Sequence, residues 1–240
     1  MRKIYIFLSI ALFFITTTNS LSAQKTIKEA TLTWAVTQSN ATSDQGAQAL
    51  EMMKSLEMKW TFNESKMLGN MTMGSMMDTK FVVDKKNDSR KVFMSMMGQK
   101  FKADLKEDQF SNMVGNMQNQ GGNDFTIKKD QTKTILGYNC YLITSEFTQR
   151  GMKGTINVYI TEDINIEDAE GLFNQNAFVD TEGNQVKGFP LSMNYQFPGF
   201  TYTMQVIELK ETFSPHLVEV PKGEEYKAMD PSMLKQFSGQ

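Results

Sequence analysis

The sequence predicts a mainly β protein of the α+β kind, in which a strongly curved antiparallel sheet or half-barrel carries a few short helices. Apolar and polar residues alternate with period two along the chain, which is typical of strands with one buried face. Turn-forming clusters such as "DKKND", "QRGMKG" and "DTEGN" separate these runs at short intervals. Such spacing favours antiparallel hairpins, because parallel pairs need long crossover connections.

The chain begins with a predicted secretory signal peptide, residues 1–23. A basic start precedes an apolar run from Ile4 to Ile15, and small polar residues follow. This run of 12 residues is too short to span a bilayer as a stable helix, although a retained membrane anchor is the alternative reading. We therefore expect residues 24–240 to be one soluble, exported β-rich domain, periplasmic or extracellular, with no stable transmembrane segment after cleavage.

Five runs carry the alternation most clearly, in the order "TLTWAVTQS" (31–39), "MKWTFN" (58–63), "GTINVYIT" (154–161), "LSMNYQFPGF" (191–200) and "TYTMQVIEL" (201–209). In the first run Leu32, Trp34 and Val36 share one side, and threonines occupy the other. Each run is therefore predicted to be a strand that buries one face.

Helical segments are few. Residues 43–58 combine Asp44, a candidate N-cap, with apolar residues at helical spacing. Residues 165–176 and 230–237 could each form two or three turns, whereas residues 111–123 are read as a loop because of their Asn and Gly content.

Composition excludes some partners. Removal of the signal peptide leaves 23 basic residues against 27 acidic ones, a net charge of −4. This is an ordinary solubilising charge without the basic surplus that nucleic acid or anionic lipid would require. We expect no nucleic-acid partner.

The single cysteine and the single histidine offer little chemistry. One cysteine excludes an intramolecular disulfide, and Cys140 alternates with Tyr138 and Leu142 on one face of a predicted strand. If that face is buried, the thiol has a raised pKa and low reactivity; an intermolecular disulfide and a reactive thiol are the alternatives. Nothing places His216 beside it, and one Cys with one His cannot build a zinc site.

Methionine is over-represented, with 19 residues in the chain. Ten of them gather in three stretches: Met67, Met71, Met73, Met76 and Met77; Met94, Met96 and Met97; Met113 and Met117. Three readings remain open: core packing, an adaptable apolar groove, and a Cu(I) site built from soft thioethers. Strand spacing within the first two stretches explains them without a metal, so we expect no metal site.

Catalytic motifs are missing from the sequence. It has no Gly-x-Ser-x-Gly elbow, no phosphate-binding glycine loop and no His-Glu-x-x-His. Its acidic pairs adjoin turns, where solvated carboxylates are expected. The prediction is a protein that is not an enzyme and that uses no cofactor.

Several stretches resemble the secreted family catalogued as domain of unknown function 4412. "TKTILGYNCY" matches that family's "T-K-x-I-x-G-Y-x-C" strand at Thr132, Lys133, Ile135, Gly137, Tyr138 and Cys140. "GFPLSM" matches a "G-x-P-x-x-M" strand at Gly188, Pro190 and Met193. The closing "P-x-G-Y" is matched by Pro221, Gly223 and Tyr226, with two residues inserted before the tyrosine.

The resemblance covers about residues 30–228, and the export signal is similar to those of Bacteroidetes-type bacteria. It implies a fold similar to the periplasmic lipoprotein-carrier proteins, a half-barrel of antiparallel strands closed by helices around an apolar cavity. The family supplies no catalytic residues, and it implies a packing role for Cys140.

The leading hypothesis is a binding protein that holds a lipid or another apolar small molecule in the concave face of the sheet. The candidate lining residues are Trp34, Trp60, Phe62, Met71, Met73, Met94, Met96, Tyr195 and Met204. Strand phase alone leaves open whether they face a cavity or a filled core. The alternatives are a structural or interaction module with an envelope protein partner and, third, a Met-based copper-binding protein.

Overall fold

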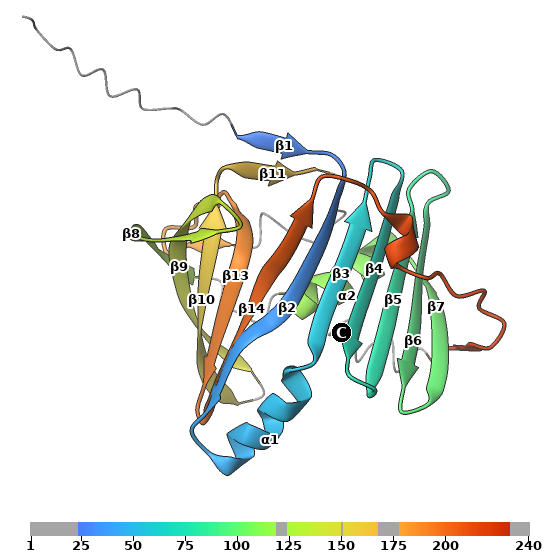
Figure 1. Cartoon of the computed structure of the whole chain (residues 1–240), viewed down its shortest axis with the longest axis horizontal. Coiled ribbons are helices and arrows are strands. Elements are labelled where there is room, and N and C mark those ends of the chain that lie inside the picture. Colours follow the sequence, from blue (N-terminus) through green and yellow to red (C-terminus); the bar gives the residue numbers. More distant parts are fainter. Residues whose placement is uncertain (1–23, 119–123, 150, 168–177, 231–240) are drawn as a thin grey trace, which may run out of the picture.

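One large curved sheet dominates the protein, as the computed structural model shows for residues 24–118, 124–149, 151–167 and 178–230 (Figure 1). The described part contains a 13-stranded sheet, a 2-stranded ribbon and a few short helices. The predicted fold class, a mainly β protein with a curved antiparallel sheet, is confirmed.

The long strands of the N-terminal half are β2 (Ala30–Ala41), β3 (Leu56–Phe62), β4 (Lys66–Met73), β5 (Met77–Asp84), β6 (Ser89–Met96) and β7 (Gln99–Leu105). Those of the C-terminal half are β8 (Asp124–Ile135), β9 (Tyr138–Gln149), β10 (Met152–Thr161), β13 (Phe189–Phe197) and β14 (Phe200–Lys210). The short elements are β1 (Lys25–Ile27), β11 (Ile164–Ile166), β12 (Val179–Asp180), β15 (Lys227–Ala228), α1 (Asp44–Met53), α2 (Glu107–Gln118) and the 3-10 helix η1 (Pro215–Leu217).

Strands follow the order β12-β8-β9-β10-β13-β14-β2-β3-β4-β5-β6-β7-β15, and all the long strands pair antiparallel with their neighbours. Only the short edge strands β12 and β15 add to it in parallel. The pair β14–β2 joins the two halves, so the first strand of the sheet lies beside the last long one. Two register shifts between β14 and β2 bend the sheet here.

Tight turns follow from local sequence. Pro198 and Gly199 close the β13–β14 hairpin, in which Phe197 pairs with Phe200, as the "FPGF" signal predicts. Met97 and Gly98 close the β6–β7 hairpin with φ values of 49° and 78°. Two successive positive φ values match the right-handed strand twist, and glycine readily adopts them.

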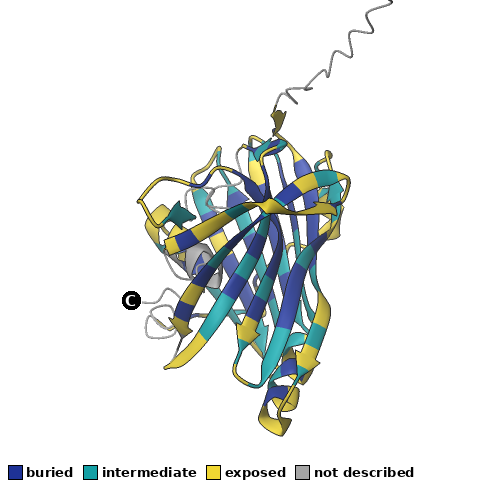
Figure 2. Cartoon of the chain, turned by 90° about the vertical axis from the view of Figure 1, so that its left-hand side faces the viewer, coloured by how far each residue is buried: buried dark blue, intermediate teal, exposed yellow. Residues whose placement is uncertain are grey.

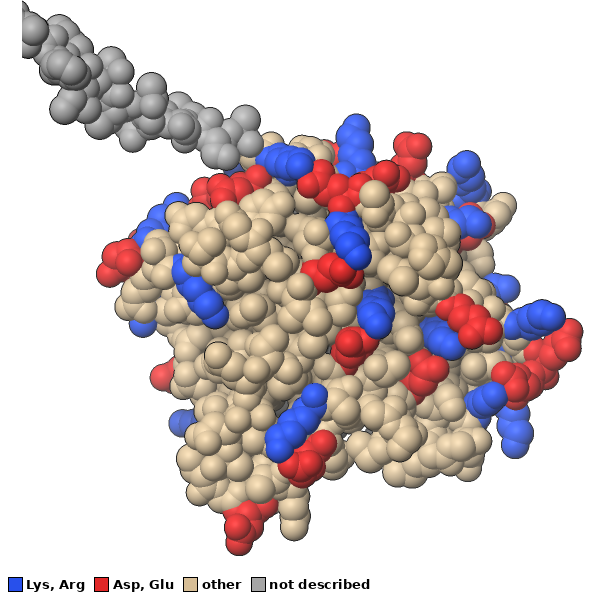
Figure 3. Space-filling model, viewed as in Figure 1, with Lys and Arg blue, Asp and Glu red and all other residues tan. Residues whose placement is uncertain are grey.

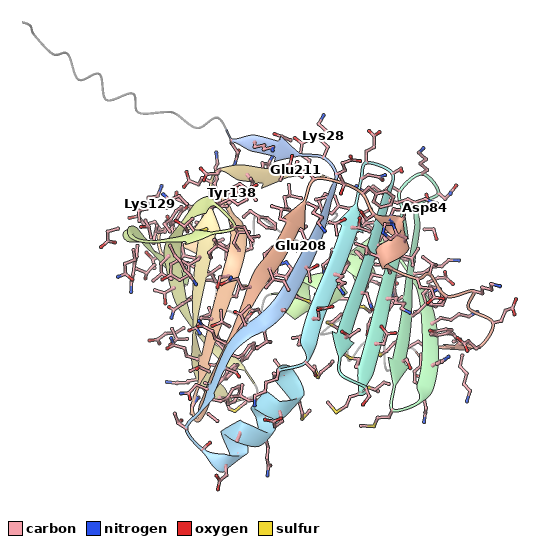
Figure 4. The ribbon with its side chains drawn as sticks, viewed as in Figure 1. Lys28, Asp84, Lys129, Tyr138, Glu208 and Glu211 are labelled. Atoms are coloured by element: carbon pink, nitrogen blue, oxygen red, sulfur yellow. The ribbon has the colours of Figure 1, made fainter. Side chains whose placement is uncertain are left out.

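The two faces of the sheet differ in chemistry. The inner, concave face carries the apolar residues, and we call it the apolar face. The outer face, seen in Figure 3, carries interspersed acidic and basic side chains. Ion pairs join Lys59 to Glu57 at 2.8 Å and Lys210 to Glu208 at 2.6 Å on this polar face, and Figure 4 labels Glu208 there.

Three segments from distant parts of the sequence cover the sheet. Helix α2 lies behind the sheet in Figure 1 and inserts Phe110 and Met113 into the core, where Phe110 contacts Phe81 edge-on at 6.2 Å. The parallel ribbon of β1 and β11 crosses one end of the sheet (Figure 1). Residues 211–229 cross the polar face over β3 to β7.

Some helix predictions need correction. The N-cap of α1 is Ser43, not Asp44, because the Ser43 hydroxyl accepts the Gly46 N–H at 3.0 Å. The predicted helix over 43–58 ends at Met53, and β3 begins at Leu56.

Residues 111–118, predicted to be a loop, belong to α2. Two apolar anchors in the core stabilise this helix despite its Asn and Gly content. In the predicted helix 165–176, Asn165 and Ile166 form part of β11. Residues 168–176 of that segment, and nearly all of the predicted helix 230–237, lie outside the described residues.

Candidate ligand-binding face

The apolar face is continuous across the sheet, because directly paired residues on antiparallel strands point to the same side. One rung of paired residues runs from β14 to β7 through Val206, Trp34, Met58, Met71, Thr79, Met94 and Phe101. In the other half a matching rung runs from β9 to β14 through Ile143, Val158, Met193 and Met204.

All nine candidate residues project from this face. Trp34, Met71 and Met94 share the first rung, and Met204 lies in the second. The remaining five, Trp60, Phe62, Met73, Met96 and Tyr195, follow at two-residue intervals along the same strands. Alternation therefore grouped side chains that lie up to 170 positions apart in the sequence.

The nine candidate residues differ in solvent exposure. Seven are buried, from Trp34 and Phe62 at 0% to Met71 at 8% of their surface, and they help to fill the core. Met73 and Met96 are half-buried. The buried seven thus pack the sheet rather than face an open space, whereas Met73 and Met96 lie where a molecule could reach them.

Burial falls steadily from one end of the apolar face to the other. Along β3, Phe62 and Trp60 are buried, whereas Met58 and Leu56 are half-buried. The same gradient appears along β4, β5, β6, β7 and β13. We call the end next to α1 the open end and the other the closed end. Figure 2 shows yellow, exposed positions at the tips beside α1 and buried positions along the strands above them.

Covering segments close the other end. Ile27 of β1 and Ile164 of β11 are 2% and 1% exposed, so the ribbon seals the apolar face there. The Lys25 ammonium pairs with Glu211 at 2.6 Å and ties β1 to the end of β14; Figure 4 labels Glu211 beside this ribbon. The gradient therefore results from segments that cover one end only.

Aromatic rings line one half of the open end. Phe197 stacks on Phe200 at 4.8 Å between ring centroids, and Tyr195 stacks on Tyr202 at 4.9 Å. Phe147 of β9 meets Phe197 edge-on at 5.3 Å. Phe197 and Phe200 are half-buried, whereas burial raises the pKa of the Tyr195 and Tyr202 hydroxyls well above its usual range.

Methionine lines the other half. Met58, Met73, Met77 and Met96 are half-buried and lie at the open end of β3, β4, β5 and β6, with Phe101 of β7 beside them. Thioether side chains are flexible and polarisable, so they adapt to irregular apolar shapes. The open end therefore combines rigid rings on one part of the face with adaptable chains on another.

Several residues of the open end were not among the nine candidates: Met58, Met77, Phe101, Phe197 and Phe200. Alternation within "MKWTFN" and "LSMNYQFPGF" places Met58 and Phe197 on the correct face. Their half-exposure depends on which end of the sheet α2 and the β1–β11 ribbon cover, and the sequence carries no signal of that.

Cys140 is buried, as predicted. Its side chain is 0% exposed, and the thiol donates a long hydrogen bond of 3.7 Å to the Tyr138 carbonyl. Burial, assisted by the nearby Asp163 carboxylate, raises the pKa of the thiol to about 11. The predicted packing role and low reactivity fit these surroundings.

Other polar groups lie away from the open end. A pocket lined by Arg90, Leu105, Glu107 and their neighbours lies near the start of α2, and none of the nine candidates lines it. His216 is exposed on η1, as expected of a surface histidine. Over the described ranges, no group of three or more His, Cys, Asp and Glu side chains is arranged to hold a metal ion.

No helix in the described part of the chain combines the length and hydrophobicity needed to cross a bilayer.

The fold and this face define a curved, open antiparallel sheet whose apolar side is accessible at one end. No protein-family model and no curated protein sequence matches the chain.

Similar solved structures include two mycobacterial proteins. The lipoprotein LppX of Mycobacterium tuberculosis is 11% identical, the match covers 78% of this chain and 89% of that one, and the TM-score is 0.37. LprF from Mycobacterium bovis is 12% identical, with 82% and 89% covered and a TM-score of 0.36.

A LolA superfamily protein from Nitrosomonas europaea is 10% identical, with 82% and 92% covered and a TM-score of 0.33. Similarity at this level does not transfer a function, so the function proposed below depends on the residues of this chain.

Proposed function

We propose that this protein is an exported, non-catalytic binding protein that holds an apolar or lipid-like ligand at the open end of the apolar face. The observation that carries the proposal is the burial gradient: the same face is sealed at one end and half-exposed at the other. Half-exposed apolar side chains on a concave surface gain free energy when a ligand covers them, at about 25 cal/mol per Å² of apolar surface.

The chemistry of the open end suits a ligand with an extended apolar part. Stacked rings on β13 and β14 offer flat surfaces, and the methionines of β3 to β6 offer a surface that can adjust. Polar groups that would recognise a charged headgroup are few here, because Glu57, Lys59 and Asp78 project from the polar face. We therefore infer recognition by shape and apolar area.

Export and family membership remain part of the proposal. The signal-peptide pattern of residues 1–23 and the strand motif around Cys140 support an exported member of the domain of unknown function 4412 family. N-terminal sequencing of the protein from a periplasmic fraction tests the first point, with Gln24 as the expected first residue.

Native mass spectrometry tests the ligand. The full chain is expressed with its own leader in a bacterial host and measured as purified, beside a denatured control. A mass increment in the range of a lipid, lost on denaturation, is the expected result. A bare protein mass that also shows no saturable binding of the probe N-phenyl-1-naphthylamine would overturn the proposal.

Variants locate the binding. Replacing half-buried Met58 or Phe200 by Gln should weaken probe binding about tenfold, since each loses on the order of 1–2 kcal/mol of apolar contact. Val82→Gln is the matched control, because Val82 is a half-buried apolar residue of β5 on the polar face. If all three variants weakened probe binding equally, the probe would not bind at the open end.

An interaction module is the second candidate function, and exposed methionines favour it. Met52 of α1, Met76 and Met97 of two hairpin turns, and Met152 at the start of β10 are 36–82% exposed and all lie at the open end. Such residues beside an apolar face suit contact with a partner. A ligand-free native mass together with stable binding of an envelope protein that M97Q weakens would favour this reading.

A further inference from the structure

Three methionines form one rung at the open end. Met73 of β4 pairs with Met77 of β5, and Met77 pairs with Met96 of β6. All three project from the apolar face, on which directly paired residues have Cβ atoms about 5 Å apart. The three side chains are therefore neighbours across three adjacent strands. We call these three residues the methionine rung.

Two more methionines adjoin the rung. Met76 and Met97 lie in the β4–β5 and β6–β7 turns, and the Met97 N–H donates to the Met76 carbonyl at 3.2 Å. Met97 has a φ of 49° and is 82% exposed. This backbone region favours Gly and Asn, so a long apolar side chain is unusual there. Five methionines therefore occupy adjoining positions at this end of β4, β5 and β6.

Core packing accounts for the rung only in part, because Met77 packs against the buried core with its exposed side left over. Its three residues are half-buried, in contrast to Met67 at 0% and Met94 at 1% on the same strands. Strand positions favour β-branched and aromatic residues, and Leu or Ile would supply the same apolar area at a half-exposed edge. What methionine adds is a sulfur donor on a side chain that is free to move.

Thioethers dominate the donors around the rung, and the amide of Gln99, which pairs with Met96, is the neighbouring polar side chain on this face. The nearest acidic residue in sequence, Asp78, projects from the polar face, where it pairs with Lys80 at 3.5 Å. Thioethers select Cu(I) among biological metal ions, and they bind hard cations such as Mg²⁺ or Ca²⁺ poorly. An apolar site without carboxylates also disfavours a doubly charged ion.

We propose that the methionine rung is a site for one soft monovalent ion, Cu(I), held by the thioether sulfurs of Met73, Met77 and Met96. Met76 and Met97 lie in the adjoining turns and are the candidates for a further thioether ligand. Sequence spacing alone did not favour a metal, because it could not show that three separate strands bring their methionines to one rung. The rung shares these three residues with the open end proposed above for an apolar ligand, but Cu(I) binding does not require that ligand.

Silver provides the first test, because Ag(I) has the same soft character and no redox chemistry under these conditions. Isothermal titration of the protein, residues 24–240, with silver nitrate should give one tightly bound ion per chain, and anaerobic Cu(I) should compete for it. Loss of one group that merely orients a ligand weakens metal sites by about 10–100-fold, so removal of all three ligands in M73L/M77L/M96L should weaken Ag(I) binding by more than about 100-fold.

A matched variant controls for exposed thioethers. M52L/M152L removes two exposed methionines of the open end that lie outside the rung, and it should bind Ag(I) as the unchanged protein does. Absence of tight binding, or equal losses in the two variants, would overturn the proposal.

A measurement on the unchanged protein covers the case in which the triple variant fails to fold. With ¹³C-methyl methionine, one equivalent of Ag(I) should shift the Met73, Met77 and Met96 methyl signals, assigned through single Met→Leu variants. Shifts at Met67, Met94 or Met204 instead would contradict the site. Probe titration of the same sample separates this result from apolar binding.

Discussion

At the scale of single residues, Gly69 shows how the core depends on one missing side chain. Gly69 of β4 pairs with Trp60 of β3 and with Phe81 of β5, and the two rings stack over it at 5.1 Å between centroids. A Cβ at Gly69 would overlap the Trp60 indole. Glycine is therefore required here for the close approach of a ring.

Gly69→Ala should destabilise the protein by about 1–3 kcal/mol, the usual cost of overpacking. The test is a double-mutant cycle in urea, because the penalty should shrink when Trp60→Leu removes the indole. A penalty of the same size in both backgrounds would show that the indole is not the cause.

Cys140 provides the second prediction at this scale. With its pKa raised to about 11, only about one thiol in a thousand is ionised at pH 8, and the side chain is fully buried. Iodoacetamide should therefore label the native protein at least about 100-fold more slowly than the urea-unfolded protein. Comparable rates would indicate an accessible thiolate, and with it a role beyond packing.

At the scale of elements, the N-terminus of α1 is fixed by its cap and by a turn. The Ser43 hydroxyl accepts the Gly46 N–H, and Gly199 in the β13–β14 turn accepts the Thr42 N–H at 2.8 Å. Gly46 is buried against that turn. The helix is thereby held beside the aromatic half of the open end.

Ser43→Ala should cost about 1 kcal/mol of unfolding free energy, because it leaves a helix N–H without its partner. Ser43→Asp should retain most of the stability, since a carboxylate caps as well as a hydroxyl. Thermal unfolding of the three proteins measures this, and equal losses in both variants would indicate a steric role instead.

Residues 211–229 cover an aromatic side chain on the polar face, which explains why it is buried. Phe93 projects there but is only 6% exposed, because Tyr226 covers it edge-on at 5.2 Å. The Lys102 ammonium donates to the Gly223 carbonyl at 2.9 Å and holds this segment in place.

Tyr226→Ala should therefore destabilise the protein by about 1–2 kcal/mol through lost ring contact and exposed apolar surface. Tyr226→Phe keeps the ring and should be close to neutral. Chemical unfolding compares them; a large loss in the Phe variant would assign the effect to the hydroxyl.

At the scale of the whole molecule, the sheet could be predicted from the sequence. Apolar residues alternate with period two within each strand, and this pattern identifies the strand and its buried face. The runs around Trp34 and Tyr195 could both be predicted as strands, with the correct buried face, without knowledge of the partner strand. α2 was missed because Asn and Gly weaken its helix propensity, and its stability comes from Phe110 and Met113 in a core built by other strands.

The site was predicted in part for the same reason. Alternation assigned nine side chains to one face, but whether Trp60 is sealed and Met58 half-exposed depends on α2 and on the β1–β11 ribbon, which are distant in sequence. The methionine rung likewise depends on the register of three strands, which a single strand does not encode.

The distribution of buried acids predicts how the whole molecule responds to alkali. Burial raises the pKa of Cys140 from an ordinary value near 9.0 to about 11, and it raises the pKa values of Tyr141, Tyr195 and Tyr202 above 10.0. From about pH 9 upward the unfolded chain loses these protons while the folded chain keeps them. The folded state then binds more protons, so its stability must fall as the pH rises.

The fall should begin near pH 9 with a slope of about 1 kcal/mol per pH unit from Cys140, and it should steepen above pH 10 as the three tyrosines contribute. Urea unfolding between pH 7 and pH 11 measures the slope. Tyr195→Phe and Tyr202→Phe should each make it shallower above pH 10, because each removes one proton that the folded state retains. Constant stability up to pH 11 would mean that these hydroxyls ionise as easily in the folded protein as in the unfolded one, and that water reaches the buried Tyr195 and Tyr202 side chains.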